Sequence, residues 1–117
     1  MSGGTYHVYY SPEAKADLKA VYSYIAFSLH AKIAAKAQTD RLRKEIRSLS
    51  FMPERYERVD WEPWHSQGVR KVPVDNYIVY YRTNGEDLSV EIVRIFYGGR
   101  DVEGIVGEIE AIPTTEE

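Results

Sequence analysis

The sequence predicts an α+β fold in which one N-terminal strand and a hairpin of two helices precede a three-stranded antiparallel meander. Apolar residues recur at helical spacing between residues 14 and 49, whereas β-branched and aromatic runs separated by turn residues fill residues 69–97. Helices followed by a run of strands indicate helices packed on one face of a mostly antiparallel sheet. We expect the N-terminal strand to join that sheet, because it would otherwise stay unpaired.

The first strand and the first helix follow each other directly. Three of the five residues from Tyr6 to Tyr10 are tyrosine, a composition that favours a strand. Ser11 and Pro12 are typical of an N-cap and a first helical turn. An apolar stripe then predicts a helix as far as residue 29, and it consists of Ala14, Leu18, Val21, Ile25 and Leu29.

A second, weaker stripe predicts a second helix that ends near Ser50, since Pro53 cannot continue it. This stripe consists of Ile33, Ala37, Leu42, Ile46 and Leu49. We place the joint between the two helices at residues 29–32. Because no Gly or Pro marks that joint, one bent helix is the alternative.

The connection over residues 53–68 contains two prolines, two tryptophans and a closing glycine, and it has no period. It is therefore predicted to be a long ordered loop with at most one short helical turn. Such loops in small domains are often functional. The alternative is that Trp61 and Trp64 simply cover the core.

Three strands are expected at residues 69–74, 77–83 and 88–97. Asp75-Asn76 predicts the first turn, and Asn84-Gly85 predicts a hairpin because both residues tolerate positive φ. The last strand is apolar on both faces in its middle, which indicates a central position beside the first strand. The other face of the sheet is expected to hold tyrosines, arginines and the long loop, partly open. The predicted core packs Leu18, Val21, Ile25, Ile46 and Leu49 against Val72, Val79, Ile92 and Ile95.

We expect a single domain over residues 1–105 and an acidic, frayed tail over residues 106–117, with residues 101–109 as either a short helix or part of that tail. Residues 1–100 contain all 15 Lys and Arg with 12 Asp and Glu, whereas residues 101–117 contain six acids and no base. The body is therefore only mildly basic, unlike a chain that must bind many phosphates by itself.

The composition excludes several classes of site. The absence of cysteine excludes disulfides, thiolate metal sites and a cysteine nucleophile, and three histidines do not suggest a multi-histidine metal site. We expect no metal and no cofactor. No apolar run approaches the about 18–20 residues of a membrane span, and the N-terminus lacks the features of a secretory signal. The expectation is a cytoplasmic protein with no membrane partner.

The candidate site residues on the strands are basic or aromatic. Arg70 and Lys71 begin one strand, Tyr97 and Arg100 close the last one, and His65 lies just ahead of the first. Arginine suits a phosphate or an acidic partner, and tyrosine or histidine can move a proton or stack on a base. The structural alternative is that the arginines of the sheet pair with neighbouring acids such as Glu91 or Asp101.

The outer face of the helix pair is a second candidate surface. It offers Tyr22 and Phe27 together with Lys36, Arg43 and Arg47, and aromatic residues flanked by cations suit an acidic amphipathic helix. We expect an apolar groove rimmed by Lys or Arg. The alternatives are that Tyr22 and Phe27 complete the core, or that a partner adds a strand to a sheet edge.

Two segments, VRKVPVDNYIVYYR over residues 69–82 and VEIVRIFYGGRD over residues 90–101, resemble the strand block of the RelE/ParE superfamily of bacterial toxins. The start, Tyr10 to Ala14 with Asp17-Leu18, is also similar to the first strand and helix of that family, and the resemblance covers about residues 6–105. It implies the toxin of a type II toxin–antitoxin, plasmid-stabilisation-like module, which inhibits growth and is neutralised by a cognate antitoxin.

The resemblance also implies a choice of target, because RelE-like members cut mRNA on the ribosome and ParE-like members poison DNA gyrase. RelE-like nucleases carry an arginine where Ile78 stands here and a late tyrosine near Ile105. Arg100 matches another of their arginines, and their basic pair on the preceding strand falls near Arg70 and Lys71.

Because two of the expected cleavage groups are missing, we favour a ParE-like toxin that acts by protein–protein contact and is not an enzyme. The first alternative is a ribosome-dependent endoribonuclease that uses Arg100, Arg70 or Lys71, and Tyr97 or His65. The second is a weakly toxic, antitoxin-bound regulator. Assembly into a homodimer stays open.

Overall fold

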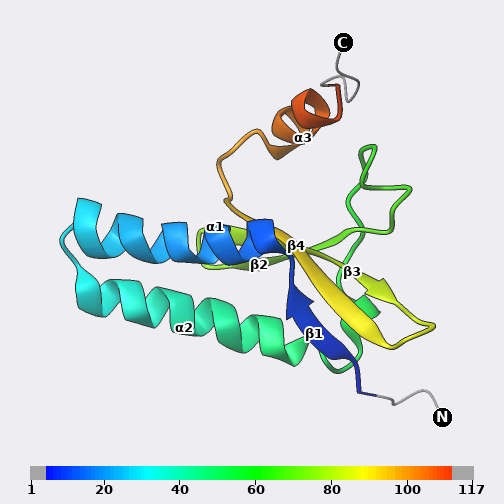
Figure 1. Ribbon diagram of the computed structural model, residues 1–117, viewed down its shortest axis with the longest axis horizontal. Helices are drawn as coiled ribbons and strands as arrows, with labels where there is room; N and C mark the ends of the chain where they lie inside the picture. The colour runs from blue at the N-terminus through cyan, green and yellow to red at the C-terminus, as the bar shows by residue number, and fades with distance from the viewer. Residues whose placement is uncertain (1–4, 112–117) are drawn as a thin grey trace.

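The computed structural model describes residues 5–111 and places two antiparallel helices beside a curved sheet (Figure 1). A π-helical segment, η1, ends the first helix, and a short 3₁₀ turn, η2, follows the second. The elements are, in order, β1 (His7–Tyr10), α1 (Pro12–Ser23), η1 (Tyr24–Ser28), α2 (Lys32–Ser48), η2 (Pro53–Arg55), β2 (Arg70–Val74), β3 (Tyr77–Asn84), β4 (Ser89–Tyr97) and α3 (Val102–Ala111).

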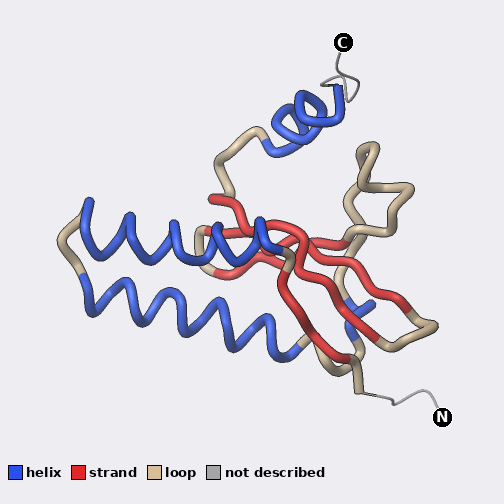
Figure 2. The backbone as a smooth tube through the Cα atoms, viewed as in Figure 1, coloured by secondary structure: helices blue, strands red, loops and turns tan. Residues whose placement is uncertain are grey.

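The four strands form one sheet in the order β1-β4-β3-β2, and Figure 2 shows them side by side. β2, β3 and β4 are antiparallel neighbours, while β1 pairs parallel to β4 with Tyr10 opposite Ile92. The predicted meander, the central last strand and the inclusion of the N-terminal strand are therefore confirmed. The β3–β4 register shifts between Tyr80 and Tyr81.

The two helices form a hairpin as predicted, with the chain reversal at residues 29–31. Ser11 is the N-cap of α1, since its Oγ accepts a hydrogen bond from the Ala14 amide at 2.9 Å. The reversal uses His30 in the left-handed conformation at φ 53°, in place of the glycine that commonly ends a helix. The tip of this hairpin projects beyond the sheet (Figure 1).

The predicted stripe of the second helix is wrong in its first turn. Ile33 is 89 % exposed, because α2 begins at the tip, where no sheet lies beneath it. The buried residues of α2 are Ala35, Gln38, Thr39, Leu42 and Ile46. Two of these are polar, and both are satisfied: Thr39 Oγ1 donates to the Ala35 carbonyl, and Gln38 Nε2 donates to Asp75.

The predicted core between helices and sheet is confirmed. All nine predicted residues belong to one cluster. Eight of the nine are buried, and Ile25 is partly buried and packs against them. Tyr81 belongs to the same cluster and is fully buried, and its hydroxyl donates to the Pro53 carbonyl at 2.5 Å. Because η2 receives this hydrogen bond, the long connection is attached to the core where it starts.

A second apolar cluster covers the other face of the sheet, which had been expected to be partly open. Alternate residues of β3 divide between the two faces, so that Tyr81 enters the first cluster and Tyr80 the second. Trp64 stacks on Trp61 with ring centroids 5.1 Å apart and lies 4.9 Å from Tyr80. The tryptophans therefore cover a core. The cluster comprises Val59, Trp64, Val69, Tyr80, Phe96, Val102 and Val106.

The β3–β4 hairpin forms as predicted, although its turn uses different residues. Asn84 pairs with Ser89, and its side-chain oxygen accepts from the Glu86 amide at 2.9 Å. The residue with positive φ is Leu88, at 53°. Because the Asn84 side chain stabilises the turn as an acceptor, the left-handed conformation expected at Asn84-Gly85 is not needed there.

The C-terminal segment forms a helix, one of the two outcomes expected for residues 101–109. Asp101 caps α3 by accepting from the Gly104 amide at 3.1 Å, and Val102 and Val106 are buried. The helix crosses residue 105, where the sequence placed the end of the domain, and this division stays a prediction. The rest of the predicted tail, residues 112–117, lies outside the described residues. Within residues 5–111, no helix has the length and hydropathy needed to cross a membrane.

Candidate functional site

The structure separates the predicted strand-end residues into two groups. Arg70, the first residue of β2, lies opposite Tyr81 in the middle of β3, whereas Tyr97 lies opposite Tyr77 at the start of β3. Tyr77 and Tyr81 are four positions apart on β3, which is roughly 13 Å at about 3.3 Å per residue. Arg70, Lys71 and His65 therefore do not share one constellation with Tyr97 and Arg100.

The first group holds the long connection in place. The Arg70 guanidinium donates to the main-chain oxygen of Tyr56 at 2.7 Å and to that of Glu54 at 3.3 Å. Lys71, which alternation places on the opposite face, forms a long ion pair with Glu57 at 3.7 Å. Both side chains thus bind the segment that leads into the connection.

His65 stabilises the same connection from within. Its Nδ1 lies 2.9 Å from the Val59 carbonyl oxygen, and its own carbonyl accepts a hydrogen bond from Arg58. Arg82 pairs with Glu91 at 2.9 Å and also reaches Gln67, as the structural alternative for these arginines predicted. The polar groups at this end of the sheet are thus already engaged with one another.

The second group surrounds a cavity of about 850 Å³ between the first helix and the ends of β3 and β4. Arg94 forms an ion pair with Asp17 at 2.8 Å, and the hydrogen bonds that its guanidinium donates to the Asp17 carboxylate raise the pKa of Arg94. Tyr97 is 53 % exposed and meets the ring of Tyr77 edge-on, with centroids 5.9 Å apart.

Arg100 also lines this cavity. The suggested ion pair with Asp101 does not form, because the Asp101 carboxylate caps α3. The guanidinium instead lies over the Phe96 ring, 5.3 Å from its centroid. In the part of the chain that the structure describes, Arg100 forms no ion pair with a carboxylate.

The outer face of the helix hairpin contains a groove of about 670 Å³. The predicted residues Tyr22, Arg43 and Arg47 line it together, and Leu18 forms part of its floor. Sequence reasoning missed Lys15 and Lys19, although they lie seven and three residues before Tyr22, a spacing that marks one helical face. The residues that line the groove are Tyr10, Lys15, Leu18, Lys19, Tyr22, Ser23, Arg43 and Arg47.

Lys36 and Phe27 lie farther along the same hairpin. Lys36 and Tyr22 line an adjoining hollow of about 450 Å³, and Lys36 pairs with Asp40 at 2.7 Å. Phe27 touches Tyr22 edge-on at 6.4 Å but is 57 % exposed. Phe27 therefore does not complete the core, whereas Tyr22 is partly buried.

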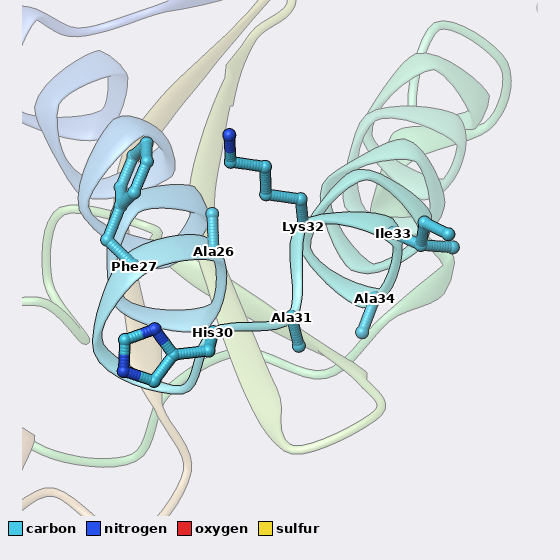
Figure 3. A pocket seen from close by; sticks show the side chains of 7 residues that line it. All are labelled: Ala26, Phe27, His30, Ala31, Lys32, Ile33 and Ala34. Atoms are coloured by element: carbon cyan, nitrogen blue, oxygen red, sulfur yellow. The ribbon is translucent and has the colours of Figure 1, made fainter.

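At the hairpin tip another hollow, of about 650 Å³, lies beside Phe27, His30 and Ile33 (Figure 3). Phe27 and Lys32 point to the same side, with the ammonium 5.7 Å from the ring centroid, while Ile33 projects away from them. Among residues 5–111, no group of three or more His, Asp or Glu side chains is arranged to hold a metal ion.

The comparison with known families shows to which family the chain belongs. The family model described as "ParE toxin of type II toxin-antitoxin system, parDE" matches residues 8–102, which include the helix hairpin and all of the sheet except His7. The chain belongs to this family. It is thus a toxin of the type II class, and the resemblance seen in the strand block is confirmed. No curated protein sequence matches the chain at a significant level.

Solved structures of related toxins have the same fold. The chromosomal ParDE system of Pseudomonas aeruginosa is similar with a TM-score of 0.66 at 20 % identity, over 80 % of this toxin and 96 % of that chain. The RelB–RelE complex of Mycobacterium tuberculosis gives 0.56 at 20 % identity, over 80 % and 92 %. Isolated Escherichia coli RelE gives 0.53 at 14 % identity, over 90 % and 98 %. At these identities the likeness supports the fold.

Proposed function

We propose that this toxin is ParE-like in action: it inhibits an essential bacterial target such as DNA gyrase by protein–protein contact and does not cleave RNA. The observation that carries this proposal is the separation of the basic residues. Cleavage requires a base, a phosphate-binding cation and an acid within hydrogen-bond reach of one bond. Here Arg70, Lys71 and His65 support a loop at one end of the sheet, and Tyr97 and Arg100 lie at the other.

The covered sheet face also supports a non-enzymatic function. Trp64, Tyr80 and Phe96 are each at most 5 % exposed, and Trp61 stacks on this layer. Within residues 5–111 this face is a closely packed apolar layer, so it offers an RNA strand few exposed aromatic rings on which to stack. A protein surface is the better match for what the toxin leaves exposed.

We also propose that the groove between α1 and α2 is the antitoxin site. Four bases rim it, namely Lys15, Lys19, Arg43 and Arg47, around the apolar surface of Leu18 and Tyr22. An antitoxin segment with an apolar stripe and acidic flanks complements both features. Arg43 has only a long 3.5 Å pair with exposed Asp40, so its charge remains available to such a partner.

The test is a supercoiling assay with purified gyrase and full-length toxin in the cytoplasmic pH range. We expect inhibition by the toxin, and recovery of activity when the cognate antitoxin is added before gyrase. A parallel assay follows mRNA cleavage on translating ribosomes. Cleavage that Arg100→Ala abolishes would instead establish the RelE-like alternative.

Induction in cells without the antitoxin separates the toxin from a weakly toxic regulator. Growth arrest with selective loss of DNA synthesis supports the ParE-like action, whereas loss of protein synthesis supports the nuclease. Growth at the normal rate, with soluble toxin present, favours the regulator. Size-exclusion chromatography with light scattering on the same protein establishes whether the toxin forms a homodimer.

A further inference from the structure

The cavity beside Arg100 is separate from the groove proposed for the antitoxin. One wall is a stripe of the first helix at helical spacing, Asp17, Ala20, Val21 and Tyr24, and the facing wall is formed by the ends of β3 and β4. Its volume of about 850 Å³ falls within the range of small-molecule sites. The cavity lies where α1 meets the ends of β3 and β4, and it shares no lining residue with the groove between α1 and α2.

The charge of the cavity favours an anion. Among the described residues that line it, Asp17 is the single acid, and its oxygens are taken by Arg94 and by the Ile95 amide. Arg94 is thereby neutralised. Arg100 is exposed, lines the cavity and has no carboxylate partner within residues 5–111, which leaves one unopposed positive charge at the rim.

Three tyrosines supply hydroxyl donors and aromatic surface to the same cavity. Tyr24 is 55 % exposed and Tyr97 is 53 % exposed, so parts of both rings face the open space. Burial raises the pKa of Tyr77, with Tyr24 and Tyr97 contributing in the same direction. A protonated phenol is a hydrogen-bond donor, and an aromatic ring stacks on a base of any sequence.

We propose that this cavity binds a free nucleoside monophosphate. The phosphate pairs with the Arg100 guanidinium, which offers a bidentate fork, and the base packs against Tyr24 and Tyr97. The apolar floor of Val21, Ile25 and Ile95 accommodates the ring, while Asn76 contributes a side-chain amide. A simple anion would use only Arg100, and an uncharged apolar ligand would leave Arg100 without a partner.

Calorimetric titration of the purified, full-length toxin with AMP and UMP tests the proposal without gyrase or antitoxin. We expect saturable binding of at least one of the two nucleotides. Adenosine or uridine alone, and inorganic phosphate alone, should bind more weakly than that nucleotide by roughly tenfold or more, since a charge-assisted pair contributes that much. Arg100→Gln should weaken nucleotide binding by roughly tenfold and leave nucleoside binding unchanged. Tyr24→Leu, at an exposed position, should weaken the binding of both nucleotide and nucleoside.

Arg82→Gln is the matched control, because it removes an exposed sheet arginine at the opposite end of β3. Thermal unfolding of each variant verifies that the fold is retained. Absence of saturable binding of both nucleotides overturns the proposal, as does equal binding by Arg100→Gln and Arg82→Gln. Either result leaves the proposed action on gyrase untouched, because that action is measured separately.

Discussion

Asp17 and Arg94 are 77 positions apart in the chain and are joined by two hydrogen bonds, of 2.8 and 3.0 Å. The pair forms where β1 stops covering the edge of β4. β1 pairs with β4 only as far as Ile92, and beyond that point the Asp17 carboxylate accepts from the Ile95 amide at 2.9 Å. The Asp17 carboxylate thus accepts a main-chain hydrogen bond from β4 where β1 no longer pairs with it, and this contact joins α1 to the sheet.

Asp17→Ala should destabilise the toxin by about 1–3 kcal/mol, because it leaves a partly buried guanidinium and a main-chain amide without their acceptor. The Asp17 and Arg94 side chains are only 15 % and 24 % exposed. Urea unfolding measures the loss as a lower midpoint. Arg94→Met should cost less, since methionine still covers Phe96 and Asp17 keeps the Ile95 amide.

Asp40→Ala is the control for this prediction. Asp40 pairs with Lys36 on the surface of α2, where the two side chains are 51 % and 75 % exposed, and such solvent-screened pairs contribute little to stability. If Asp17→Ala costs no more than Asp40→Ala, the Asp17–Arg94 pair does not hold the helix on the sheet.

Ile46→Ala should destabilise the toxin by about 2–5 kcal/mol, the usual cost of a cavity in a packed core. Ile46 is 1 % exposed at the centre of the cluster beneath α2. Ile33→Ala, on the same helix, is the matched control and should leave the unfolding midpoint almost unchanged because Ile33 is 89 % exposed. Similar losses for the two variants would contradict the packing described here.

Stability should fall at alkaline pH through Tyr81. Burial raises the pKa of its hydroxyl well above the usual value of about 10. Below a pH of about 10 the phenol is neutral in both the folded and unfolded states, so it makes no pH-dependent contribution to the free energy of unfolding. As the pH rises above about 10, the unfolded chain releases the proton first, and the free energy of unfolding decreases.

Urea unfolding of the wild type and Tyr81→Phe, at several pH values from neutral to strongly alkaline, measures this effect. At neutral pH the variant should be less stable by about 1–3 kcal/mol, because the Pro53 carbonyl loses its buried donor. The difference should shrink as the pH rises past about 10, since phenylalanine does not ionise. Parallel pH profiles would argue against this assignment.

The sequence predicts the order and the faces of the elements because their signals are local. The Ser11-Pro12 cap, the stripe from Ala14 to Ile25 and the apolar run of β4 each specify an element on their own. The prediction for Leu29, the last residue of the predicted stripe, was wrong, because Leu29 lies at the hairpin tip and is 54 % exposed. Ile33 was misassigned because periodicity records which face a residue is on but not whether anything lies beneath that face. Only the position of the hairpin tip beyond the sheet decides that it is exposed.

The candidate site was less predictable, because it depends on pairing over long distances. Sequence proximity suggested that Arg100 and Asp101 pair, yet the Asp101 carboxylate caps α3. The sheet arginine that does form an ion pair at this end is Arg94, and its partner is Asp17 of α1. Likewise, the sequence alone does not show which strand ends lie close together in the sheet. The register places Arg70 opposite Tyr81 and Tyr97 opposite Tyr77, four positions apart along β3, which divides one predicted constellation into a loop anchor and a cavity.

Charge reversal in the α1–α2 groove should weaken the antitoxin complex. Arg43→Glu combined with Arg47→Glu removes two of the four cations that rim the groove. We expect a loss in affinity of roughly tenfold or more and a shallower dependence on salt, since close charge pairs across interfaces contribute at least that much and salt screens them. Titration of the labelled cognate antitoxin at several salt concentrations measures both quantities.

Lys44→Glu is the control, because Lys44 lies beside Arg43 on α2 but does not line the groove. Tyr22→Ala tests the apolar part and should weaken binding at every salt concentration equally. If the double reversal leaves both the affinity and its salt dependence unchanged, the antitoxin binds elsewhere. The free edge of β1 then becomes the better candidate, since β1 pairs with β4 on one side only, and an added strand would complete its unpaired main-chain groups.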